Sequence, residues 1–315
     1  MNWKICVAAL IGLAFTQQGA WALDTIRVGK SVPIAWTFTP LDIGVETGIW
    51  AKHDLKLDIT SFGGDAKLQQ ALAADGVDFG VGSGPGMGFA VKGVPAKAVA
   101  AFAGSPYSIS IVIPANAPYS DIKEMKGKKF AVTTIGSLTE WLLHRAALAQ
   151  GWKYNDLRAV PLGSFETNYA AFKTGQIDGI VLATETSYML EAKKEAKIIA
   201  NMGAYAPKFI THVIYARDEL IDNKPDLVKR FLAGWFETIA WMKANKDKSV
   251  EISARVLKLP PEIVSRAYDE EIGMMQDNGR FDPDAVKVIK SSLVDMHILE
   301  SEPTEDQMFT TKFVQ

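Results

Sequence analysis

Short loops, each placed directly after a predicted strand, carry the residues of this sequence best suited to hold a ligand. They consist mostly of Gly, Ser and Thr with a few aromatic residues, and several lead into predicted helices. They span residues 31–37, 62–65, 82–86, 104–107, 133–139, 163–168 and 183–186. Free backbone N–H groups and the positive end of a helix dipole favour an anion or a carbonyl oxygen at such helix starts. These loops therefore predict non-covalent binding of a small molecule.

The candidate ligand contacts all lie in these loops. They are Ser31, Trp36, Thr37, Gly63, Gly64, Ser83, Gly84, Ser105, Thr134, Gly136, Ser137, Phe165 and Glu185. Because the loops contain no Arg or Lys, an anion would be held by amides and hydroxyls, which suits a sulfonate, nitrate or monocarboxylate better than a dicarboxylate. Trp36 and Phe165 could instead stack on a flat aromatic ring, and Glu185 could meet a cationic or hydroxyl group.

Several of these residues also have a purely structural interpretation. Ser137 and Glu140 have the spacing of a capping box, so Glu140 is expected to satisfy its own helix N-terminus. Ser83 and Ser137 could act as helix caps alone. Glu185 could simply be an acidic residue favoured by the start of a helix. The glycines at 82–88 are not followed by Lys-Ser or Lys-Thr, so they do not form a nucleotide-binding loop.

Short apolar strands alternate with amphipathic helices through the first half of the chain. Strands are predicted at 26–29, 55–60, 77–81 and 96–103, and Asp65 is expected to cap the helix that follows it. The alternation restarts in the middle of the chain, with strands at 130–133, 159–162, 177–183 and 198–200. Such alternation indicates an α/β fold whose sheets are covered by helices.

The second unit is predicted to be inserted into the first. Extended segments at 107–113 and 211–216 flank it and would serve as crossings, and the pattern becomes helical from about residue 218. We therefore expect two lobes, each a mixed sheet flanked by helices, with a C-terminal helical segment. The first lobe would comprise 23–108 and 212–315, and the second 109–211.

The first 22 residues have the features of a cleaved signal peptide. Lys4 precedes an apolar stretch at 5–15, and Ala20-Trp21-Ala22 has the small-x-small pattern of a cleavage site. The only cysteine, Cys6, lies in this leader, so the mature chain is expected to have no disulfide and no cysteine nucleophile.

Charge and composition exclude several other classes. Lys and Arg number 34 against 36 Asp and Glu, with the signs mixed along the chain, so no nucleic-acid surface is indicated. The four histidines show no metal-ligand spacing, and no serine sits in a G-x-S-x-G elbow. We therefore predict no metal, no cofactor and no catalysis.

The chain resembles the type II periplasmic solute-binding proteins of ABC importers. The resemblance rests on Arg27-Val28-Gly29, Gly48-Ile49-Trp50, Phe62-Gly63-Gly64, Val77-Asp78-Phe79-Gly80 and Gly175-Gln176-Ile177-Asp178-Gly179. The group it resembles most binds nitrate, taurine, aliphatic sulfonates and thiamine precursors. The motifs mark the fold strongly and the ligand weakly.

This resemblance implies a monomeric hinge-bending clamp in the periplasm. Ligand would contact both lobes and shift an open–closed equilibrium toward the closed form, which then docks on a membrane permease driven by an ATPase. Position in the family favours Ser83 and Ser137 as contacts. Two alternatives stay open: a thiamine-precursor-type pyrimidine binding or synthesis protein, and a binding protein that serves a membrane sensor.

Overall fold

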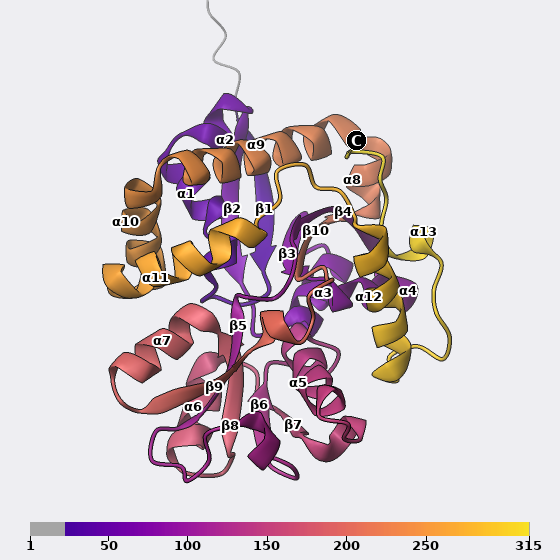
Figure 1. Cartoon of the computed structure of the whole chain (residues 1–315). Coiled ribbons are helices and arrows are strands. Elements are labelled where there is room, and N and C mark those ends of the chain that lie inside the picture. Colours follow the sequence, from indigo (N-terminus) through magenta and orange to yellow (C-terminus); the bar gives the residue numbers. More distant parts are fainter. Residues whose placement is uncertain (1–22, 315) are drawn as a thin grey trace, which may run out of the picture.

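Two five-stranded mixed sheets form the two lobes of the molecule (Figure 1). The structure, a computed structural model, describes residues 23–314, so the predicted signal peptide lies outside the described residues. The first sheet has the strand order β2-β1-β3-β10-β4. Its strands are β1 (Asp24–Lys30), β2 (Leu55–Ser61), β3 (Phe79–Ser83), β4 (Ala96–Ala103) and β10 (His212–Arg217). Strand β1 pairs in parallel with β2 and β3, whereas β10 is antiparallel to both of its neighbours.

The second sheet repeats this plan with the order β7-β6-β8-β5-β9. Its strands are β5 (Ile109–Pro114), β6 (Lys129–Val132), β7 (Arg158–Pro161), β8 (Gly179–Ala183) and β9 (Ala196–Asn201). Strand β6 is parallel to β7 and β8, and β5 is antiparallel to β8 and β9. The prediction of two lobes, each built on a mixed sheet, is confirmed.

The chain passes between the lobes twice, at 104–108 and at 202–211. The segments predicted to be extended at 107–113 and 211–216 correspond to β5 and β10. Each of them enters the sheet of the lobe that the chain has just reached, as its antiparallel member. The crossings themselves lie immediately before these strands.

Helices cover both sheets. The first lobe consists of the first sheet and the helices that lie on it. These are α1 (Pro40–Glu46), α2 (Ile49–Lys52), α3 (Asp65–Ala73), α4 (Gly88–Val91), α8 (Asp218–Asn223), α9 (Pro225–Ala244), α10 (Lys246–Leu257), α11 (Pro261–Glu271), α12 (Pro283–Asp295) and α13 (Glu305–Met308). The second lobe consists of the second sheet and the helices α5 (Leu138–Ala149), α6 (Phe165–Lys173) and α7 (Thr184–Ala192).

Helix α9 anchors the core of the first lobe. Pro225 occupies its first turn, where no N–H is needed. Phe231 and Trp235 face inward and are fully buried. The ring of Phe231 stacks between Phe79 of β3, at 4.2 Å, and Trp50 of α2, at 5.1 Å. Each such buried aromatic side chain contributes about 2 to 3 kcal/mol through removal from water, so this stack ties α2 and α9 to the centre of the sheet.

A matching aspartate precedes the central parallel strand of each lobe. Asp78, just before β3, accepts a 2.8 Å hydrogen bond from the backbone N–H of Arg27. Asp178, just before β8, accepts one of 2.8 Å from Lys129. Each carboxylate thus fixes the register between two neighbouring parallel strands. This accounts for the recurrence of Val-Asp and Ile-Asp in the two halves of the sequence, and for strands that begin two residues later than predicted.

Among the described residues, no helix combines the length and apolar character needed to cross a membrane.

Candidate functional site

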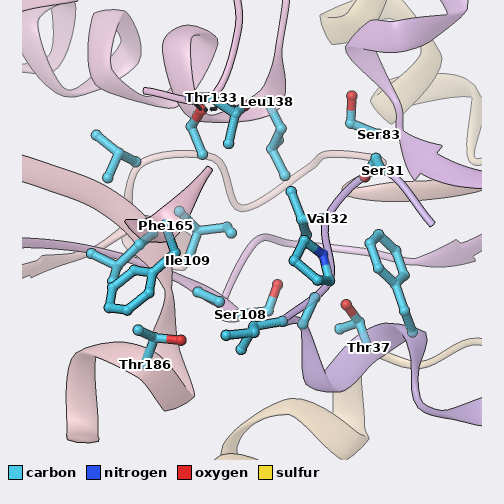
Figure 2. A pocket seen from close by; sticks show the side chains of 18 of the residues that line it. Ser31, Val32, Thr37, Ser83, Ser108, Ile109, Thr133, Leu138, Phe165 and Thr186 are labelled. Atoms are coloured by element: carbon cyan, nitrogen blue, oxygen red, sulfur yellow. Dashed lines mark hydrogen bonds between the residues drawn. The ribbon is translucent and has the colours of Figure 1, made fainter. Parts of the chain in front are cut away.

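A partly enclosed cavity of about 90 Å³ lies between the two lobes, where the loops at the carboxyl ends of both sheets meet. Figure 2 shows Ser31, Val32 and Thr37 from the first lobe facing Thr133 and Phe165 from the second across this space. The lining draws on almost every loop that the sequence indicates, on Ser108 of the first crossing and on His212, directly after the second. Because neither lobe closes the cavity alone, its shape depends on how the lobes are held together.

Some of the predicted contact residues line this cavity. They are Ser31, Trp36, Thr37, Gly63, Ser83, Phe165 and Glu185. Trp36 is fully buried, and its ring meets Tyr268 edge-on with centroids 5.5 Å apart. Phe165 stacks on Tyr169 at 5.5 Å within α6.

Two predicted contacts instead form a tight junction between the lobes beside the cavity. Gly64, with φ +123° and ψ 163°, precedes α3. A Cβ on this residue would lie 2.6 Å from the side-chain methyl of Thr134 in the second lobe. Gly64 and Thr134 are therefore placed to control how closely the lobes approach, and neither lines the cavity.

The other predicted contacts lie outside the cavity lining and have structural roles. Gly84 donates its N–H to the Thr211 carbonyl at 3.1 Å, and a Cβ on it would collide with the backbone oxygen of Ile210. Ser105 donates to the Pro207 carbonyl at 2.5 Å, which joins the two crossings. Gly136, with φ +75°, and Ser137 form the start of α5.

Ser137 is the N-cap of α5, as predicted. Its hydroxyl accepts from the N–H of Glu140 at 3.3 Å, and it is fully buried. The carboxylate of Glu140 in turn accepts the N–H of Gly136 at 2.7 Å, one residue before the cap. The expectation that Glu140 serves its own helix N-terminus is confirmed, with this shift of one residue.

Asp65 is not the helix cap that its position suggested. Gly64 is the N-cap of α3, and the Asp65 carboxylate turns toward β3, where it accepts the N–H and the hydroxyl of Ser83, both at 2.9 Å. The backbone N–H of Leu138, in the first turn of α5, also favours its charged form, although burial dominates and raises the pKa of Asp65. A carboxylate of the first lobe thus occupies the helix start at which the sequence suggested an anionic ligand.

Replacing Asp65 is expected to destabilise the protein. Asp65→Ala leaves the buried N–H and hydroxyl of Ser83 without their acceptor, which should lower the free energy of unfolding by about 1 to 3 kcal/mol. Urea denaturation measures this change. Asp58→Ala, at an exposed carboxylate of β2, is the control and should be nearly neutral. Equal stability of the two variants would contradict this role.

Glu185 bridges the lobes at the other end of the cavity. Its Oε1 accepts the backbone N–H of Trp36 at 2.7 Å, and the residue is fully buried at the start of α7. Burial is the largest cause that raises the pKa of Glu185, to about 7. Glu271, the last residue of α11, lines the same end and is also fully buried. Burial first, then the charges of Glu185 and Glu270, raise its pKa well above the usual range.

His212, the first residue of β10, also lines the cavity. It packs against Phe38 and Phe102, with ring centroids 4.8 and 5.6 Å away. Burial lowers the pKa of His212 to about 3, so the imidazole is neutral at physiological pH. Sequence reasoning missed both His212 and Glu271. The only signal was that His212 begins the segment predicted to be extended.

The ionisable groups that line the cavity are Asp65, Glu185, Glu271 and the neutral His212. No Arg or Lys among the described residues lines it, which agrees with the composition of the loops. The site therefore offers carboxyl groups and hydroxyls at its ends and apolar side chains between them.

Two open α/β lobes joined by two crossings, with a partly enclosed cavity between their loops, are the architecture of the periplasmic solute-binding proteins. The family model described as NMT1/THI5 like matches residues 36–249, and the chain belongs to this family.

Relatives and solved structures agree with this membership. The chain is 29% identical over 262 residues to a binding protein of Brucella abortus (strain 2308), covering 82% of this chain and 80% of the relative. It is 27% identical over 250 residues to an aliphatic sulfonates-binding protein of Bacillus subtilis (strain 168), covering 77% and 72%.

Two solved structures share the fold. The alkanesulfonate-binding protein SsuA from Xanthomonas axonopodis pv. citri, bound to MOPS, superposes with a TM-score of 0.77 at 18% identity, covering 89% of this chain and 94% of that one. The periplasmic nitrate-binding protein NrtA from Synechocystis PCC 6803 gives a TM-score of 0.70 at 16% identity, covering 90% and 83%. The predicted two-lobed fold and family resemblance are confirmed.

Proposed function

We propose that this chain captures a small organic solute between its lobes and delivers it to the permease and ATPase subunits of an ABC importer. The observation that carries the proposal is the partly enclosed cavity lined by loops of both lobes. We further propose that residues 1–22 are a cleaved leader that directs export and that the chain acts as a monomer in the periplasm. The first lobe would comprise 23–108 and 212–315, and the second lobe 109–211. Sulfonate- and nitrate-binding proteins among the relatives and structural neighbours support an importer role.

The proposed mechanism is closure of the lobes around the ligand. Contacts between the two lobes support it. Glu185 reaches Trp36, and Arg266 of α11 forms a 3.0 Å ion pair with Glu191 of α7. Arg266 also lies 3.5 Å above the ring of Tyr188. A ligand that touches both lobes would shift the equilibrium toward this arrangement by its higher affinity for it.

Binding without turnover is part of the proposal. The hydroxyl of Ser83 donates to Asp65, and no hydrogen bond joins His212 to it among the described residues. This arrangement lacks the nucleophile and base pair that covalent chemistry needs.

The test combines a thermal-shift screen of small metabolites with X-ray scattering. A compound that raises Tm should also reduce the radius of gyration, and native mass spectrometry should detect it at one molecule per chain. A protein whose scattering and Tm respond to no metabolite, and that retains no small molecule when purified, would contradict the proposal.

Removing the contact between α7 and α11 should favour the open form moderately. Arg266→Ala loses a half-exposed ion pair and a cation–π contact, together worth about 1 kcal/mol, so ligand affinity should fall about fivefold. Titration calorimetry with any ligand found in the screen measures it. Lys229→Ala, at an exposed site on α9, is the control. Unchanged affinity in Arg266→Ala would show that this contact does not contribute to closure.

A further inference from the structure

Three carboxylate oxygens at one end of the cavity have no hydrogen-bond partner among the described residues. They are Oε2 of Glu185 and both oxygens of Glu271. Both residues are fully buried and line the cavity. Buried polar atoms are almost always paired, because an unpaired one has lost its water without compensation. Two neighbouring carboxyl groups left in this state indicate that a partner outside the chain completes them.

The chemistry of the pair limits what that partner is. Carboxylates accept hydrogen bonds and attract positive charge. Among the described residues, no group of three His, Cys, Asp or Glu side chains is placed to hold a metal ion, so two carboxylates alone would have to bind one. An organic ammonium or amidinium group donates several hydrogen bonds, carries one charge and needs no further protein ligand.

The neighbouring surface indicates the shape of the rest of the ligand. Between this end and Ser83, the lining is apolar and includes Pro33. It also includes Val32, Leu138 and Phe165, which Figure 2 shows around a common space. Such walls favour a flat or compact apolar body. The unpaired and buried Nε1 of Trp36 and Oγ1 of Thr37 offer additional polar contacts.

The far end of the cavity does not favour an anion. No Arg or Lys of the described chain lines it, and the start of α5 faces the carboxylate of Asp65. An anion there would compete with Asp65 for these donors and would meet no compensating cation.

We propose that the ligand carries a protonated amino or amidino group, which Glu185 and Glu271 hold, on an apolar or heterocyclic body that fills the space beside Val32 and Phe165. This assignment rests on the proposed solute-binding function and names its ligand class. The sequence allowed an anion, an aromatic ring, or a cationic or hydroxyl group near Glu185, and this assignment favours the cationic group.

Binding of such a cation should release protons. Glu185 and Glu271 face each other, Glu270 adds a third carboxyl group, and the neutral His212 and Asp65 line the same cavity. The nearby guanidinium of Arg266 is already paired with Glu191. Ionising Glu185 and Glu271 without a cation is therefore unfavourable, whereas a bound cation favours their ionised forms and lowers their pKa values. Affinity for an amine should rise as the pH increases toward neutrality, whereas an anion bound by protonated carboxyls would show the opposite slope.

The experiment uses small probes in matched sets that share one skeleton. Benzylamine, benzyl alcohol and benzenesulfonate form one set, and ethylamine, ethanol and ethanesulfonate another, joined by aminopyridines as heterocycles. Calorimetry between pH 5.5 and 8 should show that amines bind best, with affinity increasing about threefold to tenfold per pH unit below pH 7. Glu185→Gln and Glu271→Gln should each weaken amine binding about 10- to 100-fold and reduce the pH dependence. Glu262→Gln, an exposed site on α11, is the matched control.

Different outcomes separate this assignment from the function itself. Preferential binding of sulfonates, affinity that increases as pH falls, or amine binding unaffected by both glutamine variants would overturn the amine assignment and leave solute binding intact. The same holds if native mass spectrometry finds a retained ligand without basic nitrogen. If no probe class binds and no molecule is retained, the proposed function fails with it. Circular dichroism and Tm confirm that each variant is folded.

Discussion

Gly64→Ala is expected to lower ligand affinity about 100-fold while leaving both lobes folded. With φ +123°, residue 64 has a backbone conformation that side chains with a Cβ rarely adopt. The added Cβ would also lie 2.6 Å from Cγ2 and 3.0 Å from Oγ1 of Thr134, across the junction between the lobes. The backbone strain acts in the open and closed forms alike, whereas overpacking of this kind costs up to about 3 kcal/mol in the closed form only, because the open form escapes the collision.

A control separates backbone strain from the collision between lobes. Gly93 also has a left-handed conformation, with φ +94°, but a Cβ there meets no atom within 4 Å. Gly93→Ala should therefore lower Tm slightly without changing affinity.

Removing the opposing side chain should rescue the variant. In the double variant Gly64→Ala/Thr134→Ala, the methyl and hydroxyl of Thr134 are gone, and affinity should recover by about tenfold. Calorimetry and X-ray scattering with bound ligand measure closure directly. If Gly64→Ala closes normally, or if Thr134→Ala gives no recovery, the junction does not limit the approach of the lobes.

The general position of the site followed from the sequence because strand ends are local features. Each loop is marked by the apolar run before it and by the Gly, Ser or Thr that ends it. In an α/β sheet the carboxyl ends of parallel strands meet at one edge, so local signals were enough to bring Ser31, Ser83 and Glu185 to one cavity.

Glu271 could not be found in this way, because its position depends on how the chain returns. It ends a helix of the C-terminal segment, more than 80 residues beyond Glu185, and only the packing of α11 against α7 brings the two together. Asp65 shows a second limit. Its place at the start of a helix predicted a cap, but its carboxylate instead accepts hydrogen bonds from the N–H and the hydroxyl of Ser83. At Asp65, a tertiary hydrogen bond therefore outweighed the local propensity for a helix cap.

Glu185→Gln is expected to stabilise the unliganded protein, and this gain should increase as pH rises from about 4.5 to 8. The pKa of Glu185 is about 7 in the fold, against 4.5 for the ordinary side chain. At this carboxyl group the folded state therefore binds more protons than the unfolded state across this interval, so the contribution of Glu185 to stability falls with increasing pH. For this carboxyl group the loss amounts to about 3 kcal/mol. Glutamine avoids it and can still accept the N–H of Trp36.

Melting curves of ligand-free protein at several pH values measure this effect as a difference between Glu185→Gln and the native chain. The difference should be small near pH 4.5 and reach about 5 °C or more near pH 8. His212 acts in the opposite sense, because its pKa of about 3 makes the fold more stable as the pH rises toward 6.5, but it is present in both proteins and cancels. A constant difference across the range would mean that Glu185 titrates as an ordinary carboxyl group. If Glu185→Gln gains stability and loses amine binding, the buried carboxyl pair lowers the stability of the unliganded protein but is needed to bind the ligand.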